Sequence, residues 1–191
     1  GNYITCGSWQ DIWLNESFAT FTEGIVHEEY YPELWPEWKN IKIEAITDYP
    51  GGSVFVYATT YFGNIFHSRL VYKKGAMMLF MLKWEIVDDA FYEGINNYLN
   101  DPSLAYGFAK SEDMINHWEL AADTNLTEFF NDWLYGEGYP SYELSYSQDN
   151  SNNIELIIHQ TQSVETANFF EMHVPVLFEG DSEDTLISFH H

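Results

Sequence analysis

The sequence predicts a mainly α-helical fold followed by a short antiparallel β segment. Two observations lead to this expectation. Apolar residues recur every three or four positions through much of the first 138 residues, which is typical of amphipathic helices. After Pro140, apolar and polar residues alternate instead, as they do in half-buried strands. We therefore expect a helical part over residues 1–138 and a β part over residues 139–191.

Six segments carry the helical pattern. Segment 13–30 has no proline and one glycine, and its apolar residues recur at helical spacings: Trp13, Phe18, Phe21 and Ile25. Further helices are predicted at residues 34–46, 74–86, 90–99 and 111–122. Ser111 is the expected N-cap of the last of these. Asn125 followed by Glu128 resembles a capping box, which predicts one more helix ending near Gly136.

The remaining segments read as loops and strands. Residues 48–62 contain Pro50 and two glycines, which predicts a loop or short extended structure. Strands are predicted at residues 142–146, 154–159, 172–178 and 185–189, with a polar hairpin loop between the first two. Four short strands are too few for a complete two-layer sandwich. We expect this segment to pack on the helical part or to be one portion of a larger β-sandwich domain.

Composition excludes several functions. The chain has 30 acidic and 7 basic residues, a formal net charge of -23, and such a surface repels nucleic acid. No segment approaches the roughly 20 apolar residues that a membrane span requires. Cys6 is the only cysteine, which excludes an internal disulfide and a multi-cysteine zinc site. A folded enzyme or an interaction module remains.

The most informative motif lies at the start of the chain. The run Trp13-Leu14-Asn15-Glu16-Ser17-Phe18-Ala19 falls within the first predicted helix. The segment from Gly1 to Glu23 closely resembles the part of M1 family zinc aminopeptidases (gluzincins) that follows their HExxH helix. In that family, HExxH-x18-E supplies two histidines and a glutamate to zinc, the glutamate lying in the context W-L-N-E-G-F-A.

The spacing places the ligand on one residue. A Gly-Asn pair usually follows the second histidine of the family by four residues, and if Gly1 is that glycine, the ligand glutamate falls on Glu16. The resemblance implies that Glu16 binds zinc. Glu23 lies two helical turns further along the same face. The family acid at this place orients a ligand histidine, and this role is expected for Glu23. Ser17 stands where the family usually has glycine, and a small residue is expected to fit there.

A second motif, Val71-Tyr72-Lys73-Lys74-Gly75-Ala76, resembles the Y-x-K-G sequence of the same family. The family tyrosine donates a hydrogen bond to the oxyanion of the tetrahedral intermediate. Peptide hydrolysis by zinc-activated water places negative charge on that oxygen, and a preorganised donor stabilises it by about 3–4 kcal/mol. The resemblance implies that Tyr72 is this catalytic donor.

A weaker likeness extends to the β part. Residues 129–140, which end in Gly138-Tyr139-Pro140, resemble the junction between the helical lobe and the β domain of the family. The expected fold is therefore the helical lobe of a thermolysin-like catalytic domain with the start of a β domain. The HExxH helix and the strand that binds the substrate amine are missing from this chain. We expect the remainder of a parent chain to supply the other zinc ligands, and the fragment alone to be inactive.

The leading hypothesis is thus a fragment of a zinc aminopeptidase that hydrolyses peptides with a free N-terminus. Two alternatives remain open at this point. A metal-independent glycoside hydrolase would use paired carboxylates, nominally Asp11 and Glu16. A non-catalytic interaction module would instead bind a partner through exposed aromatic residues, far from Tyr72 and Glu16.

Overall fold

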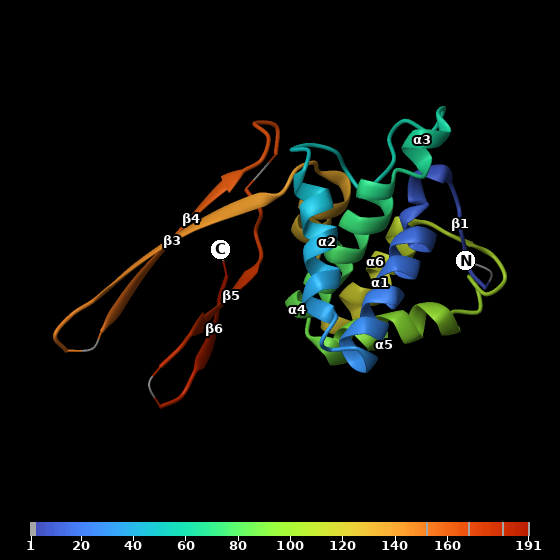
Figure 1. The fold of residues 1–191 in the computed structure, drawn as a ribbon. Coiled ribbons are helices and arrows are strands. Elements are labelled where there is room, and N and C mark those ends of the chain that lie inside the picture. The colour runs from blue at the N-terminus through green and yellow to red at the C-terminus, as the bar shows by residue number, and fades with distance from the viewer. Residues whose placement is uncertain (1–2, 152, 168, 181, 191) are drawn as a thin grey trace.

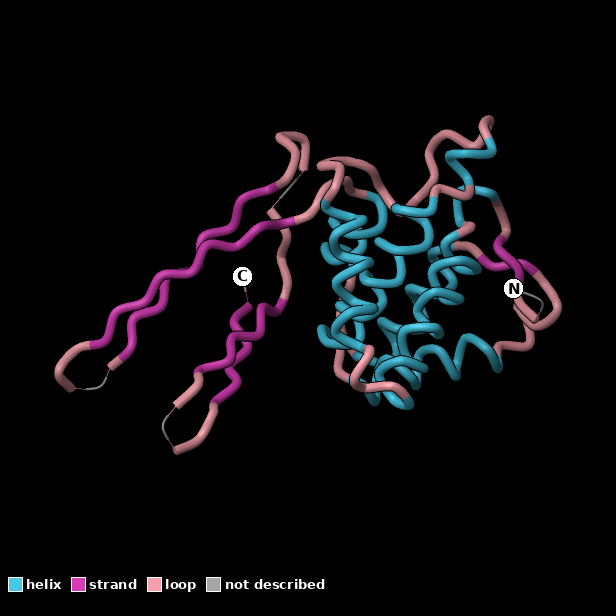
Figure 2. The backbone as a smooth tube through the Cα atoms, viewed as in Figure 1, coloured by secondary structure: helices cyan, strands magenta, loops and turns pink. Residues whose placement is uncertain are grey.

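A bundle of helices and two long β-hairpins make up the protein (Figure 1). The structure is a computed structural model and describes residues 3–151, 153–167, 169–180 and 182–190. Gly1 and Asn2, which the spacing argument for Glu16 uses, lie outside the described residues. The backbone trace in Figure 2 shows helices concentrated in the first part of the chain and strands in the last. The fold is mainly α with a short antiparallel β segment, as the sequence predicts.

Except for α3, which the sequence did not predict, the helices lie close to their expected positions. They are α1 (Trp13–Tyr30), α2 (Trp35–Thr47), α3 (Phe62–Ile65), α4 (Gly75–Glu85), α5 (Asp88–Asn100), α6 (Ser111–Ala122) and α7 (Thr127–Phe130). A short 3₁₀ turn, η1 (Trp9–Asp11), precedes α1. Two segments form π-helix, which the sequence analysis did not foresee: η2 (Ser68–Lys74) leads into α4, and η3 (Asn131–Tyr135) continues α7.

Helix α4 lies at the centre of the bundle. Met78, Leu79 and Leu82 are all fully buried, and a helix that is apolar around most of its circumference requires partners on several sides. It contacts α1, α5, η2 and η3. Trp118 of α6 extends this core, because its ring stacks on Phe91 of α5 and its Nε1 donates to the Phe91 carbonyl at 3.1 Å.

Two capping expectations prove wrong. Ser111 is the first residue of α6, and the N-cap is Lys110, whose backbone N–H donates to Asp113 Oδ2 at 2.8 Å. The buried Ser111 hydroxyl is used in tertiary contacts instead, as described below. At α7 the N-cap is Leu126, and Asn125 Oδ1 accepts from the Thr127 backbone N–H at 3.0 Å. At α6 the difference arises because Asp11, 100 residues away, accepts from both the backbone N–H and the hydroxyl of Ser111.

The chain before η1 is attached to the helices by a short parallel strand pair. Strand β1 (Thr5–Cys6) pairs with β2 (Phe108–Ala109). Asn15 Oδ1 adds a hydrogen bond from the Cys6 backbone N–H at 3.3 Å. These contacts bring the start of the chain against the start of α6.

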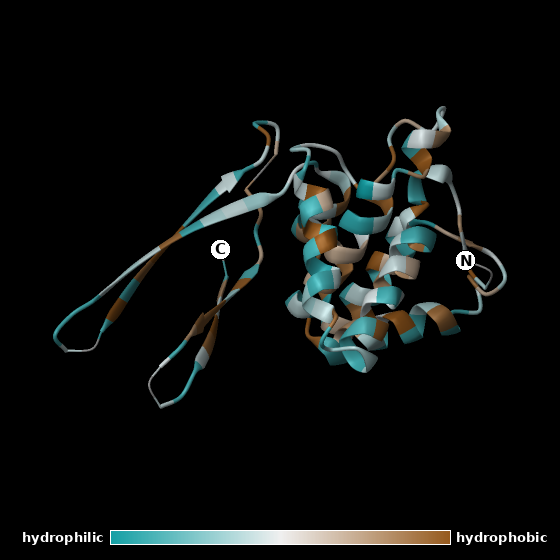
Figure 3. Ribbon diagram, viewed as in Figure 1, coloured by the Kyte–Doolittle hydropathy of each residue, from teal (hydrophilic) through white to brown (hydrophobic). Residues whose placement is uncertain are grey.

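The β part consists of two antiparallel hairpins. Strand β3 (Pro140–Gln148) pairs with β4 (Ile154–Gln162) in the register Tyr142↔Gln160. Strand β5 (His173–Phe178) pairs with β6 (Thr185–His190) in the register His173↔His190. Colouring by hydropathy shows apolar segments along both hairpins (Figure 3). Much of this apolar surface is exposed, including Leu144, Tyr146, Ile157, Leu177 and Leu186.

One buried cluster links the hairpins to the helices. The Phe170 ring packs against Trp133 of η3, with ring centroids 4.7 Å apart. The Gln160 side chain on β4 accepts from the Phe170 backbone N–H at 2.8 Å and donates to its carbonyl at 3.0 Å. The segment between β4 and β5 is therefore attached both to the first hairpin and to the helical part.

Candidate active site

Glu16 and Tyr72 meet where α1 passes η2. Glu16 lies in the first turn of α1 and is half-buried, and its carboxylate lies close enough to the Tyr72 hydroxyl to raise the pKa of that hydroxyl. Two residues that the sequence analysis selected from separate motifs are thus brought into contact. The structure therefore forms a carboxylate–phenol pair on a partly exposed surface.

The environment keeps Tyr72 protonated. Partial burial raises the pKa of the Tyr72 hydroxyl above its ordinary value, and the neighbouring Glu16 carboxylate raises this pKa further. At neutral pH the hydroxyl therefore retains its proton. A protonated phenol can donate a hydrogen bond to an oxygen that becomes negative during a reaction.

A buried hydrogen bond positions this pair. The Ser17 hydroxyl, next to Glu16, donates to the carbonyl of Val71, next to Tyr72, at 2.6 Å. Ser17 is fully buried, so this bond joins α1 and η2 where water does not compete for it. Gly75 allows the close approach, because a Cβ added there would collide with the Ser17 hydroxyl. Ser17 therefore fits at the place where the M1 family usually has glycine.

Tyr72 lies within η2, a segment of π-helix. Short π-helical turns are rare and are often found at functional sites.

Lys74, in the same segment, is buried, and its Nζ donates to the Gly52 carbonyl at 2.9 Å. Burial lowers the pKa of Lys74 to about 7, and nearby Arg69 acts in the same direction. Lys74 thus ties η2 to the loop before α3, a contact that the sequence analysis missed.

Glu23 occupies the same face of α1 as Glu16 but has other partners. Its Oε1 accepts from Trp38 Nε1 at 2.8 Å and lies 3.6 Å from Lys42 Nζ. The side chain is half exposed, and both partners belong to α2. In the described part of the chain, Glu23 is therefore engaged with α2, and its expected role beside a ligand histidine stays a prediction.

Asp11 has a structural role, because both of its carboxylate oxygens accept hydrogen bonds. Its Oδ1 accepts from the Ser111 backbone N–H at 3.0 Å and from the Ser111 hydroxyl at 2.7 Å. Its Oδ2 accepts from the Ser8 hydroxyl at 2.6 Å, and Trp13 Nε1 donates to Ser111 Oγ at 2.9 Å. With both oxygens occupied in a buried network, Asp11 is a structural anchor and does not form a catalytic pair with Glu16.

Glu16 fits zinc as a single ligand. A carboxylate that is partly exposed and adjacent to a hydroxyl donor suits the oxygen ligand of a His₂Glu site. Within the described ranges, the group of three metal-ligating side chains consists of Glu85, His173 and His190 and does not include Glu16. The other ligands of a Glu16 site would have to come from elsewhere in a longer protein.

Comparison with known proteins identifies the class and then the family. The model of the family described as "Peptidase family M1 domain" matches residues 1–133. This match covers more than half of the chain, so the family is shown and the glycoside hydrolase alternative is set aside. The chain belongs to peptidase family M1.

The sequences of individual relatives agree with this family assignment. The chain is 28% identical over 180 residues to Aminopeptidase 2, mitochondrial, of Saccharomyces cerevisiae, an alignment that covers 88% of this chain and 18% of the relative. It is 32% identical over 155 residues to Probable aminopeptidase 1 of Saccharolobus solfataricus, covering 73% of this chain and 18% of the relative. The chain thus spans about a fifth of the length of these curated relatives.

A solved structure has the same fold. Legionella pneumophila aminopeptidase A in complex with aspartic acid superposes with a TM-score of 0.77 at 18% identity, covering 100% of this chain and 22% of that one. Among the described residues, no helix is long and apolar enough to cross a bilayer.

Proposed function

We propose that this chain is part of a zinc-dependent aminopeptidase, which removes N-terminal residues from peptides with a free N-terminus. The observation that supports the proposal is the proximity of the Glu16 carboxylate to the Tyr72 hydroxyl, which the packing of α1 against η2 brings together. A zinc ligand and an oxyanion donor must face the same scissile bond, and these two side chains come from separate elements to one place. The names of the relatives, which are aminopeptidases, agree with this reaction.

Each residue has a defined role in the proposed reaction. Glu16 is one ligand of zinc, which when bound supplies a Lewis acid and an activated water. Tyr72 donates its hydroxyl proton in a hydrogen bond to the oxyanion that forms at the attacked carbonyl. Ser17 holds Glu16 beside Tyr72 through its hydrogen bond to the Val71 carbonyl. Glu23 orients a histidine ligand supplied by the rest of the protein.

The two parts of the chain have separate places in the proposed enzyme. Residues 1–138 form the helical lobe of the catalytic domain, and residues 139–191 begin a β-sandwich domain. The lobe carries one zinc ligand and no water-activating glutamate, so we expect the 191-residue chain alone to release no N-terminal residues from peptides.

The test uses the full-length protein with single substitutions. Tyr72→Phe removes the donor and keeps the ring, and we expect kcat to fall by about 10²–10³ while zinc content stays unchanged. Glu16→Gln is expected to lower zinc content and activity together. The matched controls are Tyr30→Phe and Glu29→Gln, which alter exposed residues of the same helix as Glu16 and should leave both quantities unchanged. Wild-type kcat in Tyr72→Phe, or full zinc content in Glu16→Gln, would overturn the proposal.

A further inference from the structure

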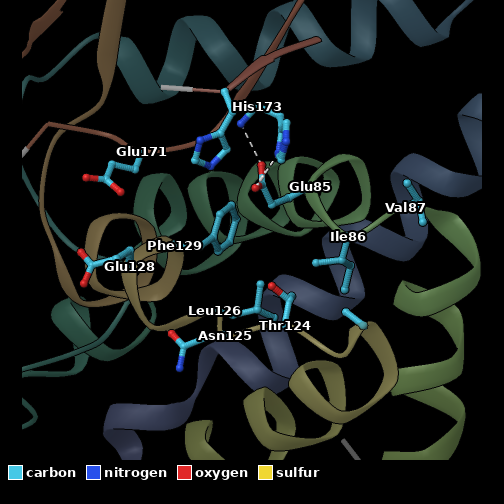
Figure 4. Close-up of a pocket in the computed structure, with 12 residues that line it drawn as sticks. Glu85, Ile86, Val87, Thr124, Asn125, Leu126, Glu128, Phe129, Glu171 and His173 are labelled. Atoms are coloured by element: carbon cyan, nitrogen blue, oxygen red, sulfur yellow. Dashed lines mark hydrogen bonds and ion pairs between the residues drawn. The ribbon is translucent and has the colours of Figure 1, made fainter.

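A second group of metal-ligating side chains lies at the opposite end of α4 from η2. Glu85 is the last residue of α4, and His173 and His190 are the first residue of β5 and the last of β6. One ligand atom of each residue lies within 4.8 Å of the other two. Figure 4 shows Glu85 and His173 facing each other beside a pocket. Helix α4, roughly 16 Å long, separates this group from Tyr72.

Glu85 is held in a fixed orientation. Its Oε2 accepts from the His173 backbone N–H at 2.9 Å, and its Oε1 is 2.7 Å from His173 Nδ1. The Glu85 side chain is only 14% exposed. A carboxylate that is fixed by a backbone donor loses little further freedom when it binds a cation.

The strand register positions the two histidines. His173 and His190 are directly opposite each other in the β5–β6 ladder, so their side chains lie on the same face of the hairpin. Their ring centroids are 4.6 Å apart. Two imidazoles on neighbouring strands thus share one side with the carboxylate of a helix.

The surroundings favour a cation. The pocket has a volume of about 420 Å³, and the acidic residues Glu128 and Glu171 also line it. Three carboxylates in one pocket create a negative potential, and the two imidazoles supply nitrogen ligands. Two histidines and one carboxylate form a ligand set that suits Zn²⁺ and leaves a position for water.

We propose that Glu85, His173 and His190 bind a zinc ion that fastens the β5–β6 hairpin to the end of α4. In the structure, Glu85 Oε1 and His173 Nδ1 form a hydrogen bond of 2.7 Å. Metal binding would replace this hydrogen bond, because the carboxylate oxygen and the imidazole nitrogen would become ligands of the ion. The ion connects elements that are distant in the chain, so its binding stabilises the attachment of the hairpin.

The test is zinc binding by the 191-residue chain, prepared without a polyhistidine tag. Isothermal titration with Zn²⁺ should show one saturable site in the wild-type chain. His190→Ala should lose this site, and because His190 is exposed, the variant is expected to fold. The control His159→Ala alters an exposed histidine on β4 and should retain the site. Glu16→Gln should also retain it, which separates this site from the zinc ligand proposed above.

Two further readouts complete the experiment. Co²⁺ should give visible absorption bands in the wild-type chain and in His159→Ala but not in His190→Ala. Zn²⁺ should raise the melting temperature of the wild-type chain and leave that of His190→Ala unchanged, since only a bound ligand stabilises the folded state. Equal zinc binding by the wild-type chain and His190→Ala, or no binding by the wild-type chain, would overturn the proposal, whatever the outcome for Glu16.

Discussion

The helical part and the hairpins use apolar residues in opposite ways. In α4, Met78 and Leu79 are fully buried, because α1, α5 and the π-helical segments cover the helix from several sides. On the hairpins, Tyr146 is 78% exposed and Ile157 is 58% exposed. Each hairpin is a separate two-stranded sheet, and in the described residues many of its apolar side chains remain exposed.

This difference shows that alternating polarity does not by itself create a core. A two-stranded hairpin is marginally stable in water unless another layer packs against it. The hairpins here are attached through the Phe170–Trp133 contact and the Gln160 hydrogen bonds. We infer that stability resides in the helical part, and that the exposed faces of the hairpins fit a larger β domain.

The largest effect is expected at Trp118, the centre of the helical core. Trp118→Ala removes a fully buried ring that stacks on Phe91, together with its hydrogen bond to the Phe91 carbonyl. We expect a loss of about 3–5 kcal/mol in the free energy of unfolding, measured by urea titration. Ile157→Ala, on the hairpin, should change it by less than about 1 kcal/mol. Similar losses for both variants would contradict the contrast between the two parts.

The buried side chain of Lys74 gives a second test of the contrast between the helical part and the hairpins. The folded state lowers the pKa of Lys74 from 10.5 to about 7. Between these values the unfolded chain binds one more proton at this residue than the folded chain, so the stability of the wild type rises with pH there. In Lys74→Met this contribution is absent. The wild type should therefore gain stability relative to Lys74→Met as pH rises from 7 toward 10, by on the order of a few kcal/mol.

The measurement for Lys74 is the difference in unfolding free energy between the two proteins at each pH. Tyrosine titrations are common to both proteins and largely cancel in this difference. Below pH 7 both states of the wild type hold the proton, so the difference should become constant. A difference that does not change between pH 7 and pH 10 would show that Lys74 is not buried as described.

The smallest of these effects is expected at the contact between α1 and α4. Gly75→Ala introduces a Cβ that collides with the Ser17 hydroxyl, and overpacking of this kind costs about 1–3 kcal/mol. Ser17→Gly removes the obstacle and should make Gly75→Ala tolerable in the double variant. A thermal-unfolding double-mutant cycle measures this coupling. Additive losses would mean that the two residues do not compete for space.

Much of the fold could be predicted from local sequence. The proposed helix at residues 13–30 has the bounds observed for α1, and all four strands occur near their expected places. These elements have strong periodicity and clear turn residues, so tertiary contacts do not override them. The π-helical segments η2 and η3 were not predicted. Their widened turns depend on packing, as the bond from Ser17 to the Val71 carbonyl illustrates.

The residues of the candidate sites were likewise predictable from the sequence only in part. Glu16 and Tyr72 were found separately, from motifs that each lie within a few residues of chain. Glu85, His173 and His190 were not found together, because no spacing rule relates a helix end to one strand that begins 88 positions later and to a second strand beyond it. Local sequence can identify a side chain suited to a chemical role, but it does not specify the distance between two such side chains.

The sequence by itself therefore determined which segments become helices and strands, and which residues resemble those of an M1 peptidase. Tertiary structure alone decided that Tyr72 reaches Glu16, that Asp11 is occupied by Ser8 and Ser111, and that two histidines meet Glu85. The physical reason is the distance along the chain over which each kind of interaction acts. Backbone preferences act over a few residues, whereas hydrogen bonds and metal ligation depend on atoms that only packing brings together.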